Sequence, residues 1–494
     1  MIKLRYLHLL HRWLGIGLGL FVLLWFMSGL VMLFVGYPQL TQTERLSHLQ
    51  PLQLQLVKLN AAQAWAATGN IGQPDKVQLD MRLQRPAYYF LQNGQWWSAW
   101  ADANSTSKIT ATLAKKSAVQ FQGNVKVLET SLIAHELINP ELIDYELIDH
   151  DQWSISSSLN GHRPLYRVAL DDTQGSELYV SSHTGEVVLD TNRSERAWNW
   201  LGSVIHWVYF TPLRMERELW RQIVLWLAFA GVILATLGLW LGIQRARFNR
   251  RYSGNRITPY RGWAKWHHII GLTAGIFCIT WLFSGWLTLT PFGWFSDRDL
   301  SVAESESWEG SKLTLQKMRL PIALTTTNIK EIEWVKFANQ PYLLAKDEQQ
   351  DWLINIQSGQ QVAPFSSTTL QLQAKQLQKN AEIASADWLT NGDLYFHQNM
   401  QKIPNVLRIT FSDPLKTSYY IDAQTTEILA SQDSNSRVYR WLFYGLHRMD
   451  IPPLGDKLLA RRICIFVLSA GGITLTVAGL VLGWRRLRRG SLKK

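Results

Sequence analysis

Four histidines stand at repeated positions beside long apolar stretches of the chain. His11 and His267 are 256 residues apart, and His206 and His447 are 241 residues apart. Imidazole is a common metal ligand, and haem iron can take one imidazole on each face of the porphyrin. Each pair could therefore clamp one haem. The pairs predict two non-covalent b-type haems with bis-histidine ligation, which suits electron transfer because no position stays open for oxygen.

Three alternatives compete with this assignment. The four histidines could be interfacial side chains that hydrogen-bond to lipid headgroups or to backbone. His8 and His268 adjoin the first pair, but their repeat positions hold Ala264 and Arg12, so the repeat argues against both. Two methionines could replace a histidine as an axial ligand, Met215 and Met449.

The second pair needs a particular chain path. His206 and His447 each lie 15 residues before an arginine, Arg221 or Arg462, that precedes the next apolar stretch. To bring His206 into place, the aromatic segment 198–210 must fold back as a helix against the membrane. The two arginines could pair with haem propionates, since a guanidinium fork matches a carboxylate, or could anchor the outer interface.

Other ligand chemistry is sparse in the sequence. The two cysteines, Cys278 and Cys464, lie inside apolar stretches, so a disulfide framework is not expected. No C-x-x-C-H run is present for a covalently attached c-type haem, and no C-x-x-C pair for zinc or an iron–sulfur cluster. No catalytic residue can be assigned. Most histidines of the polar loops are expected at the surface, although His162 or His397 could line a substrate cleft.

Four apolar stretches must position the histidines. Each has about 20 residues or more, which at ~1.5 Å per residue crosses a hydrocarbon core of ~30 Å. None has an acidic or basic residue in its middle, and they cover residues 13–35, 223–243, 269–290 and 463–484. The first is too long for a signal peptide and no small-residue cleavage site follows it. We therefore expect an uncleaved anchor and four transmembrane helices.

Basic residues set the expected orientation. By the positive-inside rule, the segments rich in lysine and arginine and free of acids face the cytoplasm, with both termini. Their basic residues are Lys3, Arg5, Arg12, Arg245, Arg247, Arg250, Arg251, Arg256, Arg261, Lys265, Arg485, Arg486, Arg488, Arg489, Lys493 and Lys494. The slightly acidic loops 38–197 and 296–440 face the periplasm. The net charge of +12 therefore reflects membrane topology and gives no support for nucleic-acid binding.

The chain is predicted to be a tandem duplication. Residues 11–29 match 267–285 at an offset of 256, with identities at His11, Gly15, Gly19, Phe21, Trp25, Ser28 and Gly29. Around the second and fourth stretches the offset is 241, with identities at Trp200, Leu201, His206, Pro212, Arg221, Gly231, Gly238, Leu239, Leu241, Gly242, Arg245 and Arg247. Both copies begin and end in the cytoplasm, so a pseudo-two-fold axis along the membrane normal should relate them.

Each long loop is predicted to be an α+β module. Residues 165–190 and 406–430 alternate apolar and polar side chains with turn residues between the runs, which is typical of antiparallel strands. An earlier strand pair is expected in each loop, near 87–109 and near 342–362. A short helix is expected at 59–68.

In these features the chain resembles the PepSY-associated transmembrane family. The resemblance rests on L-H-R-W-L-G at 10–15, its H-x-x-x-G echo at 267–271, and the hairpin motifs Y-x-V-x-L and T-G-E-V within 166–187. It implies an inner-membrane protein whose loops are PepSY-like domains. The family includes inner-membrane ferric-siderophore reductases that carry b-type haem. The resemblance thus implies reduction of a ferric siderophore or another ferric chelate at the periplasmic face.

The expected fold is membrane α-helical, with four helices in a pseudo-two-fold duplication and two periplasmic α+β domains. Its segments are a first transmembrane helix (1–37), a PepSY-like domain (38–197), an interfacial segment with the second helix (198–245), a basic linker (246–266), a third helix (267–291), a second PepSY-like domain (292–440), an interfacial segment with the fourth helix (441–485) and a basic tail (486–494).

The expected function is a haem-dependent transmembrane metalloreductase of the bacterial inner membrane, acting in iron uptake. No glycine-rich dinucleotide motif or flavin-reductase domain is found, so a separate cytosolic flavin reductase or a membrane quinol would supply the electrons. Two other functions stay open. The loops could bind or regulate a periplasmic peptidase or an assembly partner without enzymatic activity. The chain could also transport a siderophore or haem, although four spans without buried charge disfavour transport.

Overall fold

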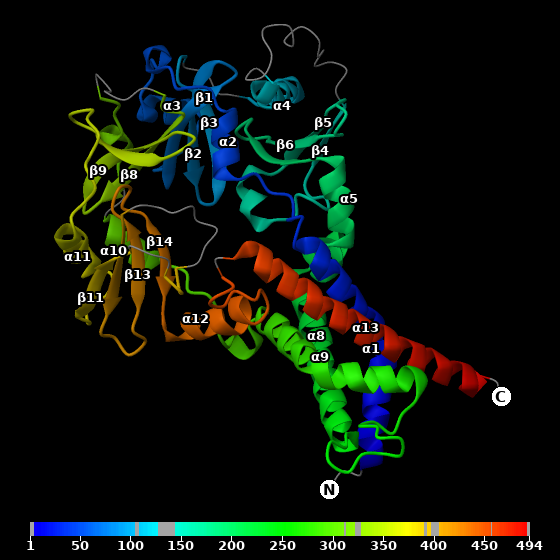
Figure 1. Cartoon of the computed structure of the whole chain (residues 1–494). Coiled ribbons are helices and arrows are strands. Elements are labelled where there is room, and N and C mark those ends of the chain that lie inside the picture. The colour runs from blue at the N-terminus through cyan, green and yellow to red at the C-terminus, as the bar shows by residue number, and fades with distance from the viewer. Residues whose placement is uncertain are drawn as a thin grey trace. The chain divides into compact units, whose positions relative to one another are not determined.

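The computed structural model divides into two compact units, each built from both halves of the chain. It describes residues 4–103, 108–126, 144–310, 313–321, 328–389, 393–396, 405–455 and 457–491. The helical unit comprises Met1–Tyr37, Ala197–Asp297 and Asn435–Lys494, and the sheet unit comprises Pro38–Arg196 and Arg298–Ser434. Figure 1 shows the helices and strands of both units.

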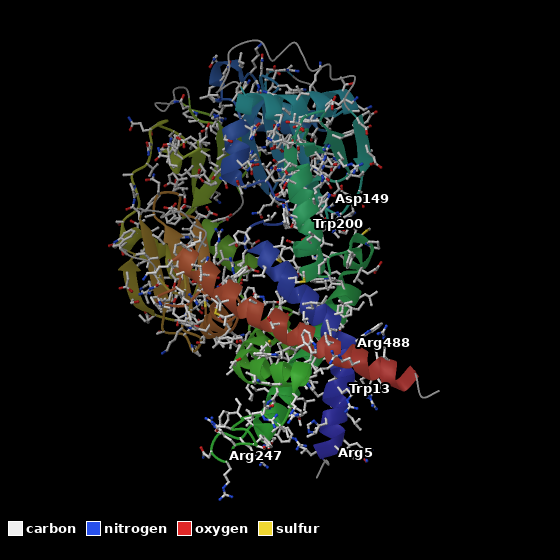
Figure 2. The ribbon with its side chains drawn as sticks, turned by 45° about the vertical axis from the view of Figure 1, so that its right-hand side comes forward. Arg5, Trp13, Asp149, Trp200, Arg247 and Arg488 are labelled. Atoms are coloured by element: carbon white, nitrogen blue, oxygen red, sulfur yellow. The ribbon has the colours of Figure 1, made fainter. Side chains whose placement is uncertain are left out.

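Four long helices frame the helical unit. They are α1 (Leu4–Met32), α8 (Arg217–Arg245), α9 (Gly262–Leu287) and α13 (Leu458–Ser491). All four are long and apolar enough to cross a membrane, which confirms the four predicted spans as candidates. They begin before the apolar stretches because helical hydrogen bonding continues into polar flanks, whereas hydropathy marks only the part that lipid would surround. Figure 2 places Arg5 and Arg247 toward one end of this unit and Trp200 toward the other.

The four helices pack so that α1 and α9 stand diagonally opposite each other. α1 contacts α8 and α13, and α9 contacts the same two helices. Glycines allow the close approaches: a Cβ at Gly19 would lie 2.9 Å from Leu480 of α13, and one at Gly231 would lie 3.2 Å from Leu282 of α9. Inward-pointing side chains of α1 and α9 therefore meet in the centre of the bundle.

Short helical segments lead into α8 and toward α13. The first set is α5 (Arg193–Leu201), α6 (Ser203–His206) and α7 (Thr211–Met215), and the second is α12 (Ser434–Tyr439) with the π-helical η7 (Arg440–Gly445). A 3₁₀ turn, η5 (Pro291–Gly293), follows α9. One helix is expected over 198–210, whereas the structure breaks it at Gly202 into the end of α5 and α6 and leaves residues 207–210 outside helices. Because α6 contacts α1 and η7 contacts α9, the fold brings the two later histidines beside these helices.

Three antiparallel sheets are found among the described residues of the sheet unit. Their strand orders are β10-β9-β8-β1-β2-β3, β11-β12-β13-β14 and β4-β5-β6-β7. The strands are β1 (Lys76–Arg82), β2 (Arg85–Gln92), β3 (Gln95–Trp100), β4 (Asp144–Ile148), β5 (Leu165–Ala169), β6 (Glu177–Ser181), β7 (Val187–Thr191), β8 (Glu331–Phe337), β9 (Gln340–Lys346), β10 (Asp351–Asn355), β11 (Ile383–Trp388), β12 (Val406–Phe411), β13 (Ser418–Asp422) and β14 (Ile428–Gln432). The helical elements are α2 (Gln42–His48), η1 (Leu54–Leu56), α3 (Ala61–Ala67), α4 (Ala111–Lys126), η4 (Ser157–His162), α10 (Val302–Glu309), η6 (Leu315–Lys317) and α11 (Ser367–Ala374).

The six-stranded sheet joins the two loops through the pairing of β1 with β8. Gln78 faces Glu333, and Asp80 faces Glu331, in antiparallel register. Gln78 occupies the same position in the hairpin β1–β2 that Glu333 occupies in the hairpin β8–β9. Because these two equivalent residues pair with each other, the pairing of β1 with β8 is symmetrical about them. The sequence predicts two separate modules, and the structure shows a sheet that both loops share.

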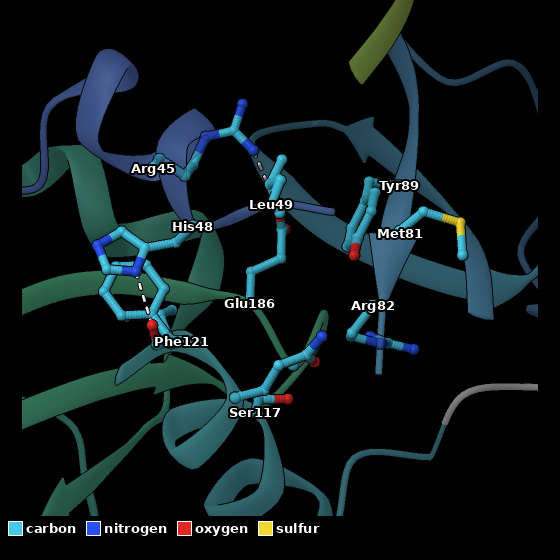
Figure 3. Close-up of a pocket in the computed structure, with 12 residues that line it drawn as sticks. Arg45, His48, Leu49, Met81, Arg82, Tyr89, Ser117, Phe121 and Glu186 are labelled. Carbon is cyan, nitrogen blue, oxygen red and sulfur yellow. Dashed lines mark hydrogen bonds and ion pairs between the residues drawn. The ribbon is translucent and has the colours of Figure 1, made fainter. Parts of the chain in front are cut away.

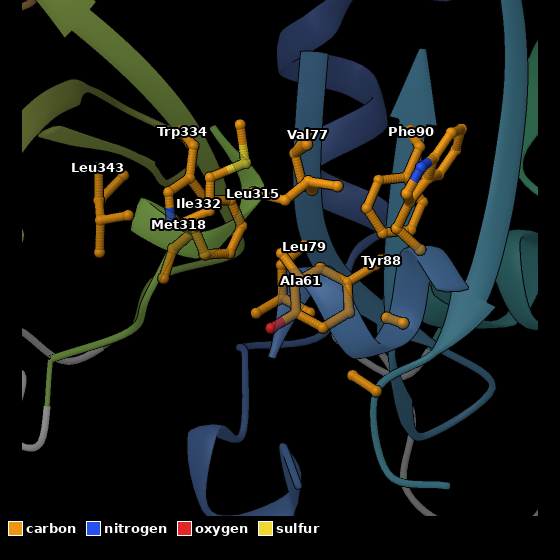
Figure 4. Packing of buried hydrophobic residues seen from close by; sticks show 14 of the residues in the cluster. Ala61, Val77, Leu79, Tyr88, Phe90, Leu315, Met318, Ile332, Trp334 and Leu343 are labelled. Carbon is orange, nitrogen blue, oxygen red and sulfur yellow. The ribbon is translucent and has the colours of Figure 1, made fainter. Parts of the chain in front are cut away.

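The largest apolar core of the sheet unit draws on both loops as well. Val77 and Leu79 of β1 pack in one cluster with Ile332 and Trp334 of β8, and all four are buried (Figure 4). Full burial of one such side chain stabilises a fold by about 1.5–3 kcal/mol. The two loops therefore share one apolar core.

A network of buried charges crosses the same strand pair. Arg45 of α2 pairs with Glu331, and Lys346 Nζ lies 2.8 Å from a Glu331 carboxylate oxygen and 3.0 Å from one of Glu333. Burial by itself raises the pKa of Glu331, but the charges of Arg45 and Lys346 outweigh burial and lower that pKa to about 2. Removing one partner of such a buried network typically costs about 3–5 kcal/mol.

Most strands expected in the loops are confirmed. Residues 165–190 contain β5, β6 and most of β7, and residues 406–430 contain β12, β13 and the start of β14. The expected helix at 59–68 is α3, and the earlier strand pairs are β2–β3 and β9–β10. The prediction lacks β4 and β11, and it also lacks β1 and β8, the two strands that join the loops.

Candidate cofactor-binding site

His11 and His267, the first pair, face each other inside the helical unit. His11 lies near the start of α1 and His267 near the start of α9. Their ring centroids are 6.3 Å apart and the ring planes are inclined by 43°. Since both residues lie near helix starts, α1 and α9 run in the same direction.

A backbone carbonyl fixes each imidazole of the first pair. His11 Nδ1 lies 3.2 Å from Leu234 O of α8, and His267 Nδ1 lies 3.2 Å from Leu475 O of α13. A carbonyl oxygen only accepts, so Nδ1 carries the proton and donates in both histidines. The lone pair on Nε2 is thereby left free, which is the form in which histidine binds a metal through Nε2.

His206 and His447, the second pair, face each other in the same way. His206 ends α6 and His447 follows η7, and their ring centroids are 6.2 Å apart with planes inclined by 71°. His206 lies beside Ser28 of α1. About 17 residues of α1 separate His11 from Ser28, which at ~1.5 Å per residue sets the two pairs ~25 Å apart along the helix.

Serine hydroxyls hold the second pair in the same tautomer. Ser28 Oγ lies 3.2 Å from His206 Nδ1, and Ser284 Oγ lies 3.0 Å from His447 Nδ1. Each serine donates its own hydrogen to the carbonyl three residues before it, so toward the imidazole it can only accept. Nδ1 therefore donates in this pair too, and Nε2 keeps its lone pair.

Glycines lie against all four imidazole rings. Gly238 and Gly479 border the first pair, and Gly29 and Gly285 border the second. A Cβ would lie 2.7 Å from the imidazole Cε1 at Gly238, 3.1 Å at Gly479, 3.3 Å at Gly29 and 3.5 Å at Gly285. A side chain at the tighter positions would push the ring away, so the absence of a Cβ sets how closely each imidazole lies on its neighbouring helix.

The chain turns sharply just after each histidine of the second pair. Val208 has a φ of 54° and Met449 a φ of 51°, each two residues beyond its histidine. This left-handed conformation costs about 1–2 kcal/mol for a residue with a side chain. Strain of this kind persists only where the surroundings hold the chain in place, and it often marks functional sites. The chain therefore makes the same left-handed turn after His206 and after His447.

The spacing of the rings fits a metal ion between the members of each pair. A metal–nitrogen bond of ~2.0 Å and ~1.1 Å from nitrogen to ring centre place two opposing centroids about 6.2 Å apart. The observed separations are 6.3 and 6.2 Å. A porphyrin supplies the four remaining donors of an iron ion, so two imidazoles complete the set. The two ring separations are therefore compatible with one axial imidazole on each side of a haem iron.

The neighbouring candidates face other partners. His268 Nε2 lies 2.9 Å from Gly242 O, which turns the ring toward α8 and favours His267 as the ligand. Met215 is exposed, and Met449 packs in an apolar cluster with Phe26. Neither arrangement favours a methionine as an axial ligand.

The two arginines predicted to meet haem propionates contact protein groups. Arg221 lies 3.3 Å from Glu218 and 3.4 Å from Thr290 O. Arg462 stacks over the ring of Phe34 at 5.4 Å. These contacts tie the starts of α8 and α13 to the segments that follow α9 and α1.

The sequence leaves open that His162 or His397 could line a substrate cleft. His162 stacks on Trp96 with ring centroids 5.6 Å apart, and His397 lies outside the described residues. The sequence argument missed the role of Ser28 and Ser284. Their identity under the 256-residue offset was the signal, because the same offset relates the histidines of the first pair.

The comparison with protein families covers both pairs. The model of the PepSY-associated TM region matches residues 8–486. The chain belongs to this family. The matched range includes all four long helices in their apolar parts and all four paired histidines, so the PepSY-associated TM region takes in the whole candidate site. A search of curated proteins finds no match.

Proposed function

We propose that this member of the PepSY-associated TM region family is a di-haem b electron-transfer protein of the bacterial inner membrane that reduces a ferric chelate. One haem would lie between His11 and His267, and the other between His206 and His447. The observation that carries the proposal is the facing imidazole pair, found twice at the separation that two axial ligands need. A bis-histidine haem exchanges one electron without opening a ligand position.

The groups around the rings prepare the imidazoles for binding. The carbonyls of Leu234 and Leu475 and the hydroxyls of Ser28 and Ser284 accept from Nδ1–H. A hydrogen bond of this kind fixes the tautomer and ring orientation and raises the basicity of Nε2. Each half of the chain therefore offers one oriented nitrogen ligand to each site.

Apolar side chains fill the helical unit between the two pairs. Phe26 of α1 and Trp281 of α9 have ring centroids 5.6 Å apart and pack with Val22 and Cys278. Such a core excludes water, so it would block ions, whereas electron transfer needs no opening. This arrangement supports a role in moving electrons rather than solutes across the membrane.

The proposed direction of electron transfer rests on the positions of basic residues, and the proposed substrate rests on the resemblance to the family. Arg5 and Arg247 lie toward the helix ends nearest the first pair, which favours a cytoplasmic first pair and periplasmic loops. Electrons would enter from a separate cytosolic flavin reductase or a quinol. Reduction of a ferric siderophore, the proposed substrate, would loosen its iron because hard oxygen ligands hold Fe(II) less tightly than Fe(III).

Counting haems in histidine variants tests the cofactor part of the proposal. The purified protein should contain two haems per chain, and His11→Ala or His206→Ala should each leave one. Combining both substitutions should leave none. His268→Ala is the matched control, because this neighbouring ring faces α8, and it should keep two haems. Equal haem loss in the control and in His11→Ala would overturn the ligand assignment.

A separate experiment tests the reductase part. The protein is reduced with dithionite, freed of excess reductant and mixed without oxygen with a ferric siderophore and an Fe(II) trap. Reoxidation of the haem spectrum should match the trapped Fe(II). If the haem stays reduced with every ferric chelate, the proposed substrate would be refuted, whereas the proposed electron-transfer function would not.

A further inference from the structure

The turn that follows α9 is built from left-handed residues that are not glycine. Thr290 has a φ of 45°, Phe292 a φ of 56° and Phe295 a φ of 41°. A side chain in this conformation crowds its own backbone, which costs free energy at each such residue. Residues 34–39, which correspond to 290–295 at the 256-residue offset, contain no residue with a positive φ. The end of a long helix in this protein therefore does not by itself require the strain.

Two of the three strained residues are held by contacts within the helical unit. The carbonyl of Thr290 accepts from Arg221 Nη2 at 3.4 Å. Phe295 packs against the buried cluster that contains Trp286 and Leu287. Backbone strain persists only where the surroundings hold the chain in place. For Thr290 and Phe295 the protein itself supplies those surroundings.

The third strained residue, Phe292, has little packing within the chain. It is 77% exposed, and its ring contacts that of Trp294, which is itself 51% exposed, with centroids 5.2 Å apart. Aromatic rings of the sheet unit show the usual alternative: Phe121 is buried and stacks on His48 with centroids 3.7 Å apart (Figure 3). The contacts that compensate the strain at Phe292 are therefore not supplied by the described residues.

A row of aromatic rings joins Phe292 to the lipid-facing surface of α8. Trp226 is exposed although it lies within a helix that is long and apolar enough to cross a membrane, so lipid would cover it. The successive ring centroids are 5.9 Å apart for Trp226 and Phe229, 5.4 Å for Phe229 and Trp286, and 6.5 Å for Trp286 and Trp294. The exposed rings of the turn therefore continue a surface that faces lipid.

The turn carries no ionisable side chain. Residues 286–296 read W-L-T-L-T-P-F-G-W-F-S, so their entry into the edge of a bilayer would desolvate no charge. Because α9 ends at Leu287, the turn directly follows a candidate span. Aromatic rings are enriched at this level, where headgroups meet acyl chains. Composition and position thus favour lipid as the group that covers Phe292.

We propose that Phe292 and Trp294 insert into the lipid leaflet at this end of α9 and make the turn 290–295 an interfacial anchor. Both rings lie between the headgroups and the acyl chains. Burial of the Phe292 ring in lipid compensates the backbone strain at that residue. The proposal does not depend on the proposed haem sites.

Spin labels on the full-length protein in nanodiscs of phosphatidylethanolamine and phosphatidylglycerol test this placement. Cys278 and Cys464 are replaced by alanine, and one label at a time is attached through Phe292→Cys, Ile276→Cys or Ile71→Cys. Ile276 is exposed within α9 and reports on lipid, whereas Ile71, which is 90% exposed in the sheet unit, reports on water. The label at 292, like that at 276, should collide more with oxygen, which concentrates in lipid, than with a water-soluble nickel chelate. A label at 292 that behaves as the label at 71 does would overturn the proposal and indicate a docking surface for a water-soluble partner.

Thermal unfolding in the same nanodiscs tests the proposal even if the cysteine-free protein does not fold. In the otherwise natural chain, Phe292→Ser removes the ring and keeps the strained backbone, so the thermal midpoint should fall. Ile71→Ser is the matched control, because it removes an exposed apolar side chain of the sheet unit, and it should leave the midpoint unchanged. An unchanged midpoint in Phe292→Ser, or an equal fall in both variants, would overturn the proposal.

Discussion

A single methyl group at Gly238 should displace the haem that we propose for the first pair. The Cβ of alanine would lie 2.7 Å from His11 Cε1, whereas ordinary van der Waals contact begins at 3.4 Å. The ring would have to retreat by about 0.7 Å, and a metal–ligand distance tolerates a change of only ~0.2 Å. Gly238→Ala should therefore lose the haem of the first pair and keep that of the second.

The other glycines provide a graded series for the same assay. At Gly479 the new Cβ would lie 3.1 Å from the ring, so partial loss is expected, and at Gly285 it would lie 3.5 Å away, so no change is expected. Alanine favours a helix over glycine by about 1 kcal/mol, so helix destabilisation cannot cause the loss. Haem per chain and the reduced-minus-oxidised spectrum are measured after gel filtration. Two intact haems in Gly238→Ala, or equal loss in Gly285→Ala, would refute the reasoning.

Other substitutions probe the strain and the buried charges. Burial raises the pKa of Asp351 to about 6, so folding stability falls as pH rises through 4 to 6. Asp351→Asn should therefore increase the free energy of unfolding at pH 7 by at most about 3 kcal/mol, which is measured as a higher thermal midpoint. The same variant should have no such effect near pH 4, and an equal gain at both pH values would contradict the shift. Val208→Gly should relieve the left-handed turn and stabilise the protein by up to about 1 kcal/mol, whereas Val208→Ala should not. Chemical unfolding that ranks the two variants in reverse would argue against strain there. Glu331→Gln should cost about 3–5 kcal/mol, because Arg45 and Lys346 lose a shared partner, and a change below about 1 kcal/mol would show that the network contributes little.

The histidine pairs could be proposed from the sequence because equivalent residues of two repeated units are expected at equivalent positions in space. Two copies of one unit place equivalent residues at the same depth, and this argument needs no coordinates. What fixes the imidazoles could not be predicted. The carbonyl of Leu234 reaches His11 from a helix more than 200 residues later, and His206 Nδ1 lies 3.2 Å from both Ser28 Oγ and the Trp25 carbonyl of α1, far earlier in the chain.

The pairing of the strands that join the loops escaped prediction for a related reason. Residues 76–82 and 331–334 read K-V-Q-L-D-M-R and E-I-E-W, so they do alternate polar and apolar side chains as a half-buried strand does, and the prediction overlooked them. The burial of Asp80 and Glu331 on the polar faces of these strands is not visible in that pattern. Their compensating partner, Arg45, is contributed by α2, far from Glu331 in the chain. Pairings over such a separation leave no local pattern in the sequence.

The visible spectrum of the purified wild-type protein, recorded oxidised, reduced, and reduced under carbon monoxide, tests the central claim most directly. The account predicts two haems per chain, low-spin in both oxidation states, and no carbon monoxide adduct, because His11, His267, His206 and His447 occupy every axial position. A protein without haem absorption, or one whose reduced haem readily binds carbon monoxide, would contradict it.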